Sequence, residues 1–330
     1  MACIVVTMGA LVLIVSLALL SCNKTDTPVV HADTTDASPN DINILCIGNS
    51  YTWDAMVYVP YILKDILPDR HVTIGLLYTG GENLQAHYRK HMLFNTSYSY
   101  FHINNDGGKW EKQSSSDLQS AISVKRWNMV TLQQSSKMTT EPSYYEDVPS
   151  AIGWVKDNID SKIATAWLLT PAYPVGGYRI THPEQYGINK SPVTSDEMFE
   201  MIAECVKSEV ADRVDFIMPV GTAVQNARHS TLSTMGRGGS LTNDGVHLQE
   251  GIPRLIAAYA VCQSIIDHLN LNVSIDNSQF VPTDEFVKEH ITTAMQTGLA
   301  VGLTDNNVSI ARQCALAANS TPYQITVSSE

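Results

Sequence analysis

The sequence predicts an α/β protein built on a parallel sheet that helices cover on both faces. Short apolar runs alternate with longer segments of helical periodicity, and glycine or proline ends most of the runs. Strands separated by helices need crossover connections, which are right-handed and bring helices onto the sheet. The predicted strands are residues 42–47, 71–78, 129–132, 163–169 and 214–218.

The predicted helices have apolar residues at helical spacing and residues that stop the pattern. In segment 54–67, Met56, Val59 and Ile62 lie on overlapping faces, and Pro68 ends the segment. The other predicted helices are residues 84–91, 116–125, 144–159, 195–210, 252–269 and 283–300.

One segment interrupts this alternation of strands and helices. Runs 98–103 and 109–112 flank the sequence NNDGG at residues 104–108, which is a strong hairpin turn signal. We therefore expect a small excursion there, in addition to the five parallel strands.

The start of the chain is typical of an exported protein. Residues 1–21 carry no charged side chain and have the apolar core of a signal peptide. The core ends in the sequence LLSC at residues 19–22, which resembles a bacterial lipobox with Cys22 as the lipidated residue. The missing Lys or Arg before the core departs from that pattern, and a single-pass anchor is the alternative. We expect a lipid-anchored protein of the bacterial cell envelope, held to the membrane through its N-terminus.

The remainder divides into a tether and one domain. Residues 22–41 are rich in Thr, Asp, Pro, Ala and Ser, so they cannot bury enough surface to fold alone. Residues 42–330 are long enough for one large α/β domain. The formal charge of −12 argues against a nucleic-acid partner, because phosphates require a basic face.

The cysteines and histidines predict no cofactor. Cys46, Cys205, Cys262 and Cys314 each lie in an apolar pattern, which favours buried thiols over a zinc site, with pairing of two of them as the alternative. We identify no phosphate-binding loop, no dinucleotide fingerprint and no histidine pair at helical ligand spacing. We therefore expect no metal, nucleotide or redox cofactor.

Three residues can supply the groups of a serine hydrolase. Ser50 lies between the first strand and a helix, where the helix dipole favours developing negative charge. Asp244 precedes His247 by three residues with Gly245 between them, so one tight turn can bring the two side chains together. The histidine can then accept the serine proton while the carboxylate holds its tautomer. A helix cap at Ser50 and an ordinary turn at Gly245 are the structural alternatives.

Acyl transfer also needs hydrogen-bond donors for the tetrahedral oxyanion. Ligands of parallel sheets bind beyond the carboxyl ends of the strands. Donors available there are the backbone amides of Ser50 and of Gly80 or Gly81, and a side-chain amide from Gln133 or Gln134. The alternative is that the two glycines form only a strand-to-helix turn.

These residues resemble the sequence blocks of the SGNH (GDSL-like) hydrolases. Residues 48–52 (GNSYT) are similar to the first block, 80–83 (GGEN) to the glycine block and 244–247 (DGVH) to the last block. The resemblance covers residues 42–269. It implies ester hydrolysis by the serine, an oxyanion donor at Gly81, and a flavodoxin-like three-layer α/β/α fold with a central parallel five-stranded sheet.

Two positions depart from the family pattern. Asn49 stands where the family usually has an aspartate, and residues 132–135 (LQQS) stand where it has Gly-x-Asn-Asp. The absent asparagine would supply the third oxyanion donor, so Gln133 and Gln134 are the remaining candidates. The pattern resembles a poorly characterised bacterial branch with a Leu-Gln third block.

We expect an esterase that removes an acetyl or another small acyl group from a carbohydrate through an acyl-Ser50 intermediate. Asn49 and the aromatic residues Trp53, Tyr173 and Tyr178 are expected to contact the substrate, with packing as the alternative for the aromatic rings. Two other functions fit the same fold. One is a glycan-binding lipoprotein without turnover, and the other is a lipase or thioesterase, which requires an extended apolar groove.

Overall fold

The computed structural model describes residues 40–113, 115–174, 194–236, 240–291 and 300–326. These residues lie within one compact unit. The predicted signal peptide, the lipobox with Cys22 and nearly all of the tether lie outside the described residues.

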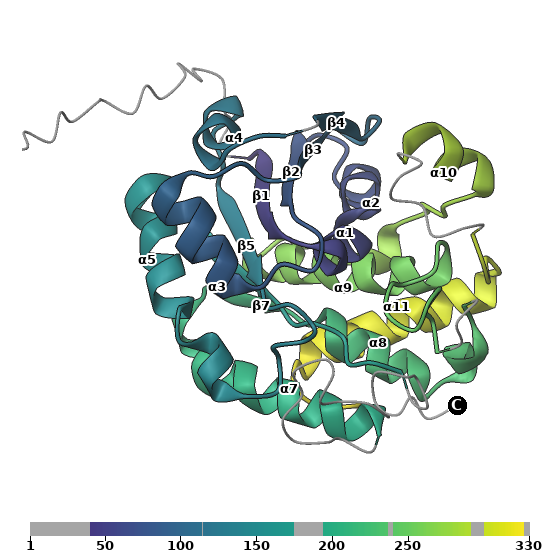
Figure 1. The fold of residues 1–330 in the computed structure, drawn as a ribbon. Helices are drawn as coiled ribbons and strands as arrows, with labels where there is room; N and C mark the ends of the chain where they lie inside the picture. Colours follow the sequence, from purple (N-terminus) through teal and green to yellow (C-terminus); the bar gives the residue numbers. More distant parts are fainter. Residues whose placement is uncertain (1–39, 114, 175–193, 237–239, 292–299, 327–330) are drawn as a thin grey trace, which may run out of the picture. The chain divides into compact units, whose positions relative to one another are not determined.

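The centre of the unit is a seven-stranded mixed sheet with strand order β4-β3-β2-β1-β5-β6-β7 (Figure 1). The five predicted strands form its parallel part. They are β1 (Ile42–Gly48), β2 (Val72–Tyr78), β5 (Met129–Gln133), β6 (Ala164–Leu168) and β7 (Phe216–Met218).

The expected count of five strands is wrong, because the predicted hairpin joins the sheet. Its strands, β3 (Tyr100–Asn105) and β4 (Glu111–Gln113), extend the sheet in antiparallel orientation from β2. Without β3, one side of β2 would carry a row of unpaired backbone N–H and C=O groups. The hairpin pairs those groups, which a reading of local turn signals alone does not reveal.

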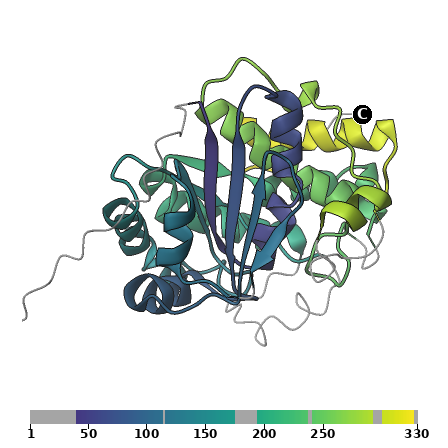
Figure 2. The ribbon, with the colours of Figure 1, turned by 90° about the horizontal axis from the view of Figure 1, so that it is seen from above.

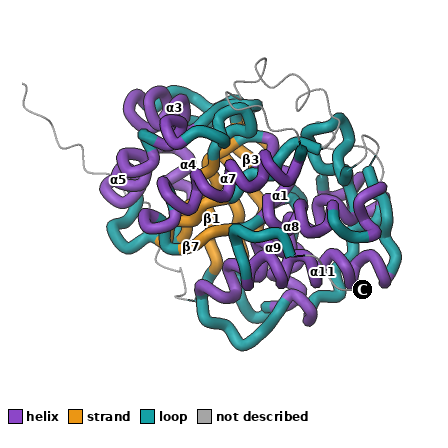
Figure 3. The backbone as a smooth tube through the Cα atoms, turned by 90° about the horizontal axis from the view of Figure 1, so that it is seen from below, coloured by secondary structure: helices purple, strands orange, loops and turns teal. Residues whose placement is uncertain are grey.

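Helices cover both faces of the sheet (Figures 2 and 3). The buried apolar side chains form two separate cores. The first face carries α1 (Ser50–Met56), α2 (Val59–Ile66), α8 (Val220–Arg228), α9 (Ile252–His268), α10 (Asp284–His290) and α11 (Asp305–Ser320). The second carries α3 (Leu84–Ala86), the π-helix η1 (His87–Met92), α4 (Leu118–Val124), α5 (Val148–Asn158) and α7 (Ser195–Glu209). The predicted three-layer α/β/α class is confirmed.

The single helix expected over residues 54–67 is two helices. The first, α1, already begins at Ser50, because Asn49 caps it. The second, α2, begins at Val59 and has Pro60 in its first turn, where the missing N–H costs no helical hydrogen bond. Proline also disfavours helical geometry in the residue before it, so the chain cannot continue smoothly from α1 into α2.

The long helix α9 is almost entirely buried. Every residue of α9 from Ile252 to Ile266 is buried. In the described part of the chain, no helix has both the length and the apolar character needed to cross a bilayer. The four cysteines predicted to be buried are buried, and they are not joined in disulfides.

The strand register brings the candidate site residues to one edge of the sheet. Strands β1 and β2 pair in parallel from Ile42 with Val72 to Gly48 with Tyr78, and β5 lies on the other side of β1. The carboxyl ends of these three strands therefore lie next to one another. Ser50 follows the end of β1 after Asn49, and the glycine loop (residues 79–82) follows β2. Gln133 is the last residue of β5, and Gln134 comes directly after it.

Candidate active site

Ser50 is the first residue of α1. The preceding residue, Asn49, has an extended backbone, and its side-chain oxygen accepts a hydrogen bond from the amide of Tyr51 at 3.0 Å. The cap of the helix is therefore Asn49, so the alternative that Ser50 is only a helix cap is wrong. The Ser50 hydroxyl remains free for chemistry, and its amide, at the first helical position, has no intrahelical acceptor.

A tight turn forms the acid and base pair. Gly245 adopts a backbone φ of +80°, a value that glycine reaches without strain. The turn lets one carboxylate oxygen of Asp244 accept from the amides of Val246 (3.0 Å) and His247 (2.8 Å). The Asn243 amide donates to the His247 carbonyl at 2.7 Å and closes the loop. The turn expected as the structural alternative therefore exists, and it is what orients the two side chains.

The three side chains form a continuous chain of hydrogen bonds. The second carboxylate oxygen of Asp244 lies 2.8 Å from Nδ1 of His247, and Nε2 of His247 lies 2.9 Å from Oγ of Ser50. A carboxylate only accepts, so Nδ1 must carry a proton, and in the neutral ring Nε2 is left with a lone pair facing the serine. This is the tautomer that a general base requires.

The local field keeps Asp244 ionised. Partial burial raises the pKa of its carboxyl, but the hydrogen bonds from the backbone and side chain of His247 outweigh this effect, and the net pKa lies below the usual value. His247 and Asp244 keep 34% and 47% of their side-chain surfaces exposed, so the pair remains open to a substrate.

The glycine loop is held beside Ser50 by two hydrogen bonds. The Thr79 amide donates to the Gly48 carbonyl at 3.2 Å, and Nδ2 of Asn49 donates to the Glu82 carbonyl at 2.9 Å. Within the loop, Gly81 is exposed and has a φ of +66°. A side chain at Gly81 would meet no other atom within 4 Å, so the space beside its backbone is open. The amides of Ser50 and Gly81 remain the predicted oxyanion donors.

The two glutamines have different surroundings. Both side-chain hydrogens of Gln134 are used, because its nitrogen donates to the Tyr144 carbonyl at 2.7 Å and to Gln85 at 3.2 Å. Its oxygen accepts from the amides of Leu84 and Ser135. The prediction of Gln134 as an oxyanion donor is therefore wrong, since this side chain braces the loop after β5.

Gln133 keeps an unused donor. Its amide oxygen accepts from the hydroxyl of Thr52 in the first turn of α1. Its buried side-chain nitrogen has no hydrogen-bond partner among the described residues. Gln133 therefore stays the predicted side-chain donor of the oxyanion hole.

The link between Asn49 and Glu82 predicts a kinetic effect of a near-isosteric change. In Asn49→Asp, the capping oxygen is retained, but the group that donates to the Glu82 carbonyl becomes an oxygen that repels it. We expect kcat for an ester substrate to fall roughly 10- to 100-fold, because displacement of catalytic groups by about 1 Å can cost that much. Steady-state kinetics with thermal unfolding measures the effect.

Asn277→Asp is the matched control for that change. The oxygen of the Asn277 side chain also accepts a capping hydrogen bond, from the amide of Ser274 at 2.9 Å, within the separate turn Ile275–Asn277. Its kcat should stay within about twofold of the wild type, as for a surface change away from special features. Equal kcat values for Asn49→Asp and the wild type would show that the hydrogen bond from Asn49 to Glu82 does not hold the glycine loop in place.

The aromatic residues expected to contact substrate are packing residues. Trp53 is 1% exposed and packs against the rings of Trp110 and His102 at centroid distances of 5.1 Å each. Tyr173 is fully buried and donates to the hydroxyl of Ser136 at 2.8 Å. The prediction that these two rings stack on a sugar is wrong, and Tyr178 lies outside the described residues.

A buried ionic network lies behind Ser50, Asp244 and His247, the proposed catalytic triad, and it was not predicted from the sequence. Arg254 of α9 pairs with Asp54 of α1 at 2.7 Å and with Glu250, and all three side chains are almost fully buried. The other oxygen of Asp54 accepts from the amide of Leu248 at 2.8 Å. The network therefore fixes the residue next to His247 to the helix that carries Ser50. In the sequence, Asp54 reads as an ordinary residue near a helix start.

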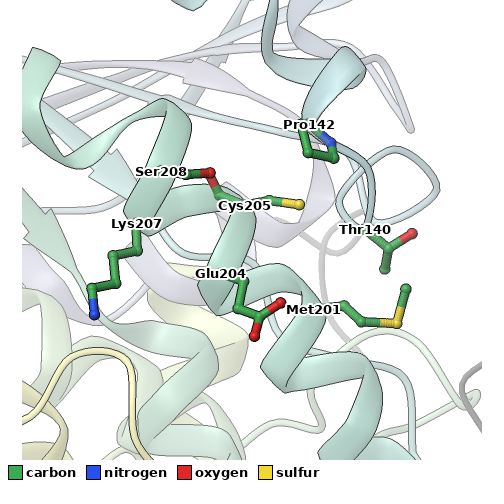
Figure 4. Close-up of a pocket in the computed structure, with 7 residues that line it drawn as sticks. All are labelled: Thr140, Pro142, Met201, Glu204, Cys205, Lys207 and Ser208. Atoms are coloured by element: carbon green, nitrogen blue, oxygen red, sulfur yellow. The ribbon is translucent and has the colours of Figure 1, made fainter.

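A separate pocket of about 570 Å³ lies beside α7 (Figure 4). It is lined by Thr140, Pro142, Met201, Glu204, Cys205, Lys207 and Ser208. Because its lining contains no residue of the triad or of the glycine loop, we do not assign it to the reaction.

Comparisons with known proteins agree with this architecture. A family model described as a domain of unknown function, DUF4886, matches residues 43–292. The fold is similar to the crystal structure of a DUF4886 family protein from Bacteroides uniformis ATCC 8492, with a TM-score of 0.69 and 21% sequence identity over 87% of this chain and 97% of that chain. No curated protein sequence matches the chain.

Two further structures are similar at lower scores. One is a candidate SGNH hydrolase from Slackia heliotrinireducens, with a TM-score of 0.46 and 19% identity over 68% of this chain and 100% of that chain. The other is a catalytic mutant of an acetylxylan esterase from Geobacillus stearothermophilus, with a TM-score of 0.40 and 10% identity over 72% of this chain and 97% of that chain. The resemblance to the SGNH hydrolases continues to rest on the sequence blocks of this chain and on the geometry of Ser50, Asp244 and His247.

Proposed function

This chain belongs to the DUF4886 family, and we propose that it is a serine esterase that removes a small acyl group, such as acetyl, from a carbohydrate. The observation that carries the proposal is the hydrogen-bonded chain from Asp244 through His247 to Ser50. A protein that only binds glycans has no physical need for a base aligned on a serine hydroxyl. The exposure of the pair favours a reaction with an external substrate.

Acylation follows from the direction of the hydrogen bonds. Oγ of Ser50 attacks the ester carbonyl while Nε2 of His247 takes the hydroxyl proton, and Asp244 stabilises the imidazolium that forms. The amides of Ser50 and Gly81, with the side chain of Gln133, are proposed to hold the oxyanion of the tetrahedral intermediate. Collapse of the intermediate breaks the ester bond, and the alcohol leaves with the proton from Nε2.

Deacylation repeats these steps with water. The ester carbonyl of acyl-Ser50 is attacked by a water molecule whose proton passes to Nε2 of His247. The second tetrahedral intermediate collapses, Oγ of Ser50 recovers the proton and the carboxylic acid departs. Both half-reactions use one base and one oxyanion site.

Two tyrosines support the carbohydrate part of the proposal. Tyr78 ends β2, and its hydroxyl lies 3.5 Å from the point where a side chain at Gly80 would begin. Its ring lies 6.0 Å from that of Tyr100, and both side chains are partly exposed. A tyrosine that is partly exposed to solvent can contact a sugar with both its ring and its hydroxyl group. Tyr78 and Tyr100 therefore replace Trp53 and Tyr173 in the proposed substrate site.

The test compares acyl chain lengths and acceptors in the purified protein. We expect hydrolysis of p-nitrophenyl acetate to exceed that of the butyrate and octanoate esters, and acetate release from acetylated oligosaccharides. We also expect a fluorophosphonate probe to label Ser50. A preference for octanoate would replace the proposal with a lipase or thioesterase. If the protein neither hydrolyses these esters nor is labelled by the probe, but still binds glycans, a binding protein would replace the proposal.

A further inference from the structure

Three side chains with metal-binding atoms meet next to the glycine loop. Glu82 closes that loop, and His87 and His91 lie on the π-helix η1. One oxygen of Glu82 and one ring nitrogen of each histidine all lie within 4.8 Å of one another. Both histidines are buried, with 1% and 5% of their surfaces exposed. The expectation that the chain has no histidine pair at ligand spacing is wrong, because His87 and His91 are four residues apart.

Both ring nitrogens of His91 face acceptors. Nδ1 lies 2.8 Å from the Thr96 carbonyl oxygen, and Nε2 lies 2.8 Å from Oε2 of Glu82. Nδ1 also lies 3.0 Å from the Thr96 hydroxyl. With the proton on Nδ1 and donated to the Thr96 carbonyl, Nε2 would offer a lone pair to a cation between itself and the Glu82 carboxylate.

His87 is the third member of the cluster. Among the described residues, neither of its ring nitrogens has a hydrogen-bond partner. A buried polar group without a hydrogen-bond partner costs free energy. A cation shared by the cluster would remove this cost.

We propose that Glu82, His87 and His91 bind a divalent transition metal ion, with Zn²⁺ as the best match. Two imidazoles and one carboxylate, with a fourth position for water, form an established zinc ligand set. Ligand atoms at a tetrahedral zinc lie about 3.3 Å apart, so small side-chain movements suffice to close the site around the ion.

The neighbouring residues fit this assignment. Nδ1 of His91 lies 2.8 Å from the Thr96 carbonyl oxygen, and an acceptor at this place is what commonly orients a metal-bound histidine. Lys90 pairs with Oε1 of Glu82 at 3.1 Å and leaves Oε2 directed at His91. Single-turn π-helices also occur often at functional sites.

The ion would act on the glycine loop. The Glu82 carbonyl accepts the hydrogen bond from Asn49, the residue before Ser50. Fixing the side chain of Glu82 to η1 therefore fixes the same residue that anchors the loop beside the nucleophile. We assign the ion a positioning role, with no contact to the ester.

Metal binding is measured on the whole protein after removal of metals with a chelator. We expect one Zn²⁺ per chain by elemental analysis after gel filtration, and a rise in the midpoint of thermal unfolding on adding ZnCl₂. Co²⁺ alone should give the intense visible absorption of tetrahedral coordination. These readouts do not depend on esterase activity, so failure of the proposed function leaves them interpretable.

The variants are His87→Leu, His91→Leu and Glu82→Gln, with two controls. Each ligand variant should lose at least 10- to 100-fold in Zn²⁺ affinity by calorimetry. His102→Leu is the matched control, because His102 is also buried and both its nitrogens lack partners among the described residues. His247→Ala excludes binding at the triad. Both controls should bind Zn²⁺ as the wild type does.

Two results would overturn the proposal. One is a wild-type protein that retains no Zn²⁺ and gives no tetrahedral Co²⁺ spectrum. The other is a folded His87→Leu with unchanged Zn²⁺ affinity, which would leave His91 and Glu82 as a buried ion pair. If His87→Leu does not fold, Glu82→Gln answers the same question, because it keeps the backbone carbonyl that Asn49 uses.

Discussion

Replacing Ser50 with alanine is expected to lower kcat/KM for ester hydrolysis by a factor of about 10⁴ to 10⁶. This is the range seen when a nucleophile of a serine hydrolase triad is removed. His247→Ala should lose a similar amount, because Oγ is a weak nucleophile without a base at 2.9 Å. Since the residues act as one unit, the double variant should be scarcely slower than either single variant.

The carboxylate of the triad has a separate signature. Asp244→Asn leaves a group beside Nδ1 that can donate and so favours the wrong tautomer of His247, for which a loss of about 10⁴ is expected. The measurements are kcat/KM with p-nitrophenyl acetate and labelling by a fluorophosphonate. Ser123→Ala, at an exposed position of α4, is the control and should keep full activity. Activity above about a tenth of the wild type in Ser50→Ala would mean that another residue is the nucleophile.

Removing the charge of Arg254 should produce the largest loss of stability. Arg254 forms ion pairs with the buried carboxylates of both Asp54 and Glu250. Breaking a buried ion pair by removing one partner costs about 3–5 kcal/mol, because the remaining charge is left uncompensated. We therefore expect Arg254→Met to lose that much free energy of unfolding, measured by urea denaturation.

The pH dependence of this variant follows from the same burial. Burial already raises the pKa of Asp54 in the presence of the arginine, which opposes it. Without Arg254, the folded-state pKa rises further above its unfolded value of about 4, so the folded state binds more protons than the unfolded state. Stability must then fall as pH rises through that interval. Arg254→Met should be less destabilised at pH 5 than at pH 8.

Arg213→Met is the control for size and charge. Arg213 is exposed and donates to the Glu209 carbonyl at the end of α7. It should change the free energy of unfolding by less than about 0.5 kcal/mol at both pH values. A loss in Arg254→Met no larger than this, or a loss independent of pH, would contradict the electrostatic account of the network.

The parallel strands and the triad were accessible from sequence for physical reasons. A parallel strand buried on both faces must be almost wholly apolar, so strands such as β1 and β5 stand out as continuous runs. The acid and base lie three residues apart in one turn, and glycine at position 245 marks that turn locally. The placement of Ser50 follows from the end of β1.

The remaining features depend on contacts that no local pattern encodes. Pairing of β3 with β2 joins strands whose turn signals are independent. Asp54 and Arg254 are 200 residues apart and meet only because α1 packs against α9. In the sequence, Trp53 resembles an exposed aromatic residue near Ser50, whereas in the structure it is buried against Trp110. Gln134 has the donor atoms of an oxyanion side chain, but its neighbours after folding use both of them.

The turn that holds Asp244 and His247 has a consequence for how activity arises during folding. Acid and base are assembled by hydrogen bonds between residues at most four apart, so this half of the machinery is a local unit. The proposed nucleophile, Ser50, lies 197 positions earlier in the chain. In the proposed esterase, catalysis would therefore begin only when this one long-range contact has formed. Turnover would then report correct chain topology, because a compact, helical polypeptide with the wrong topology would have no activity.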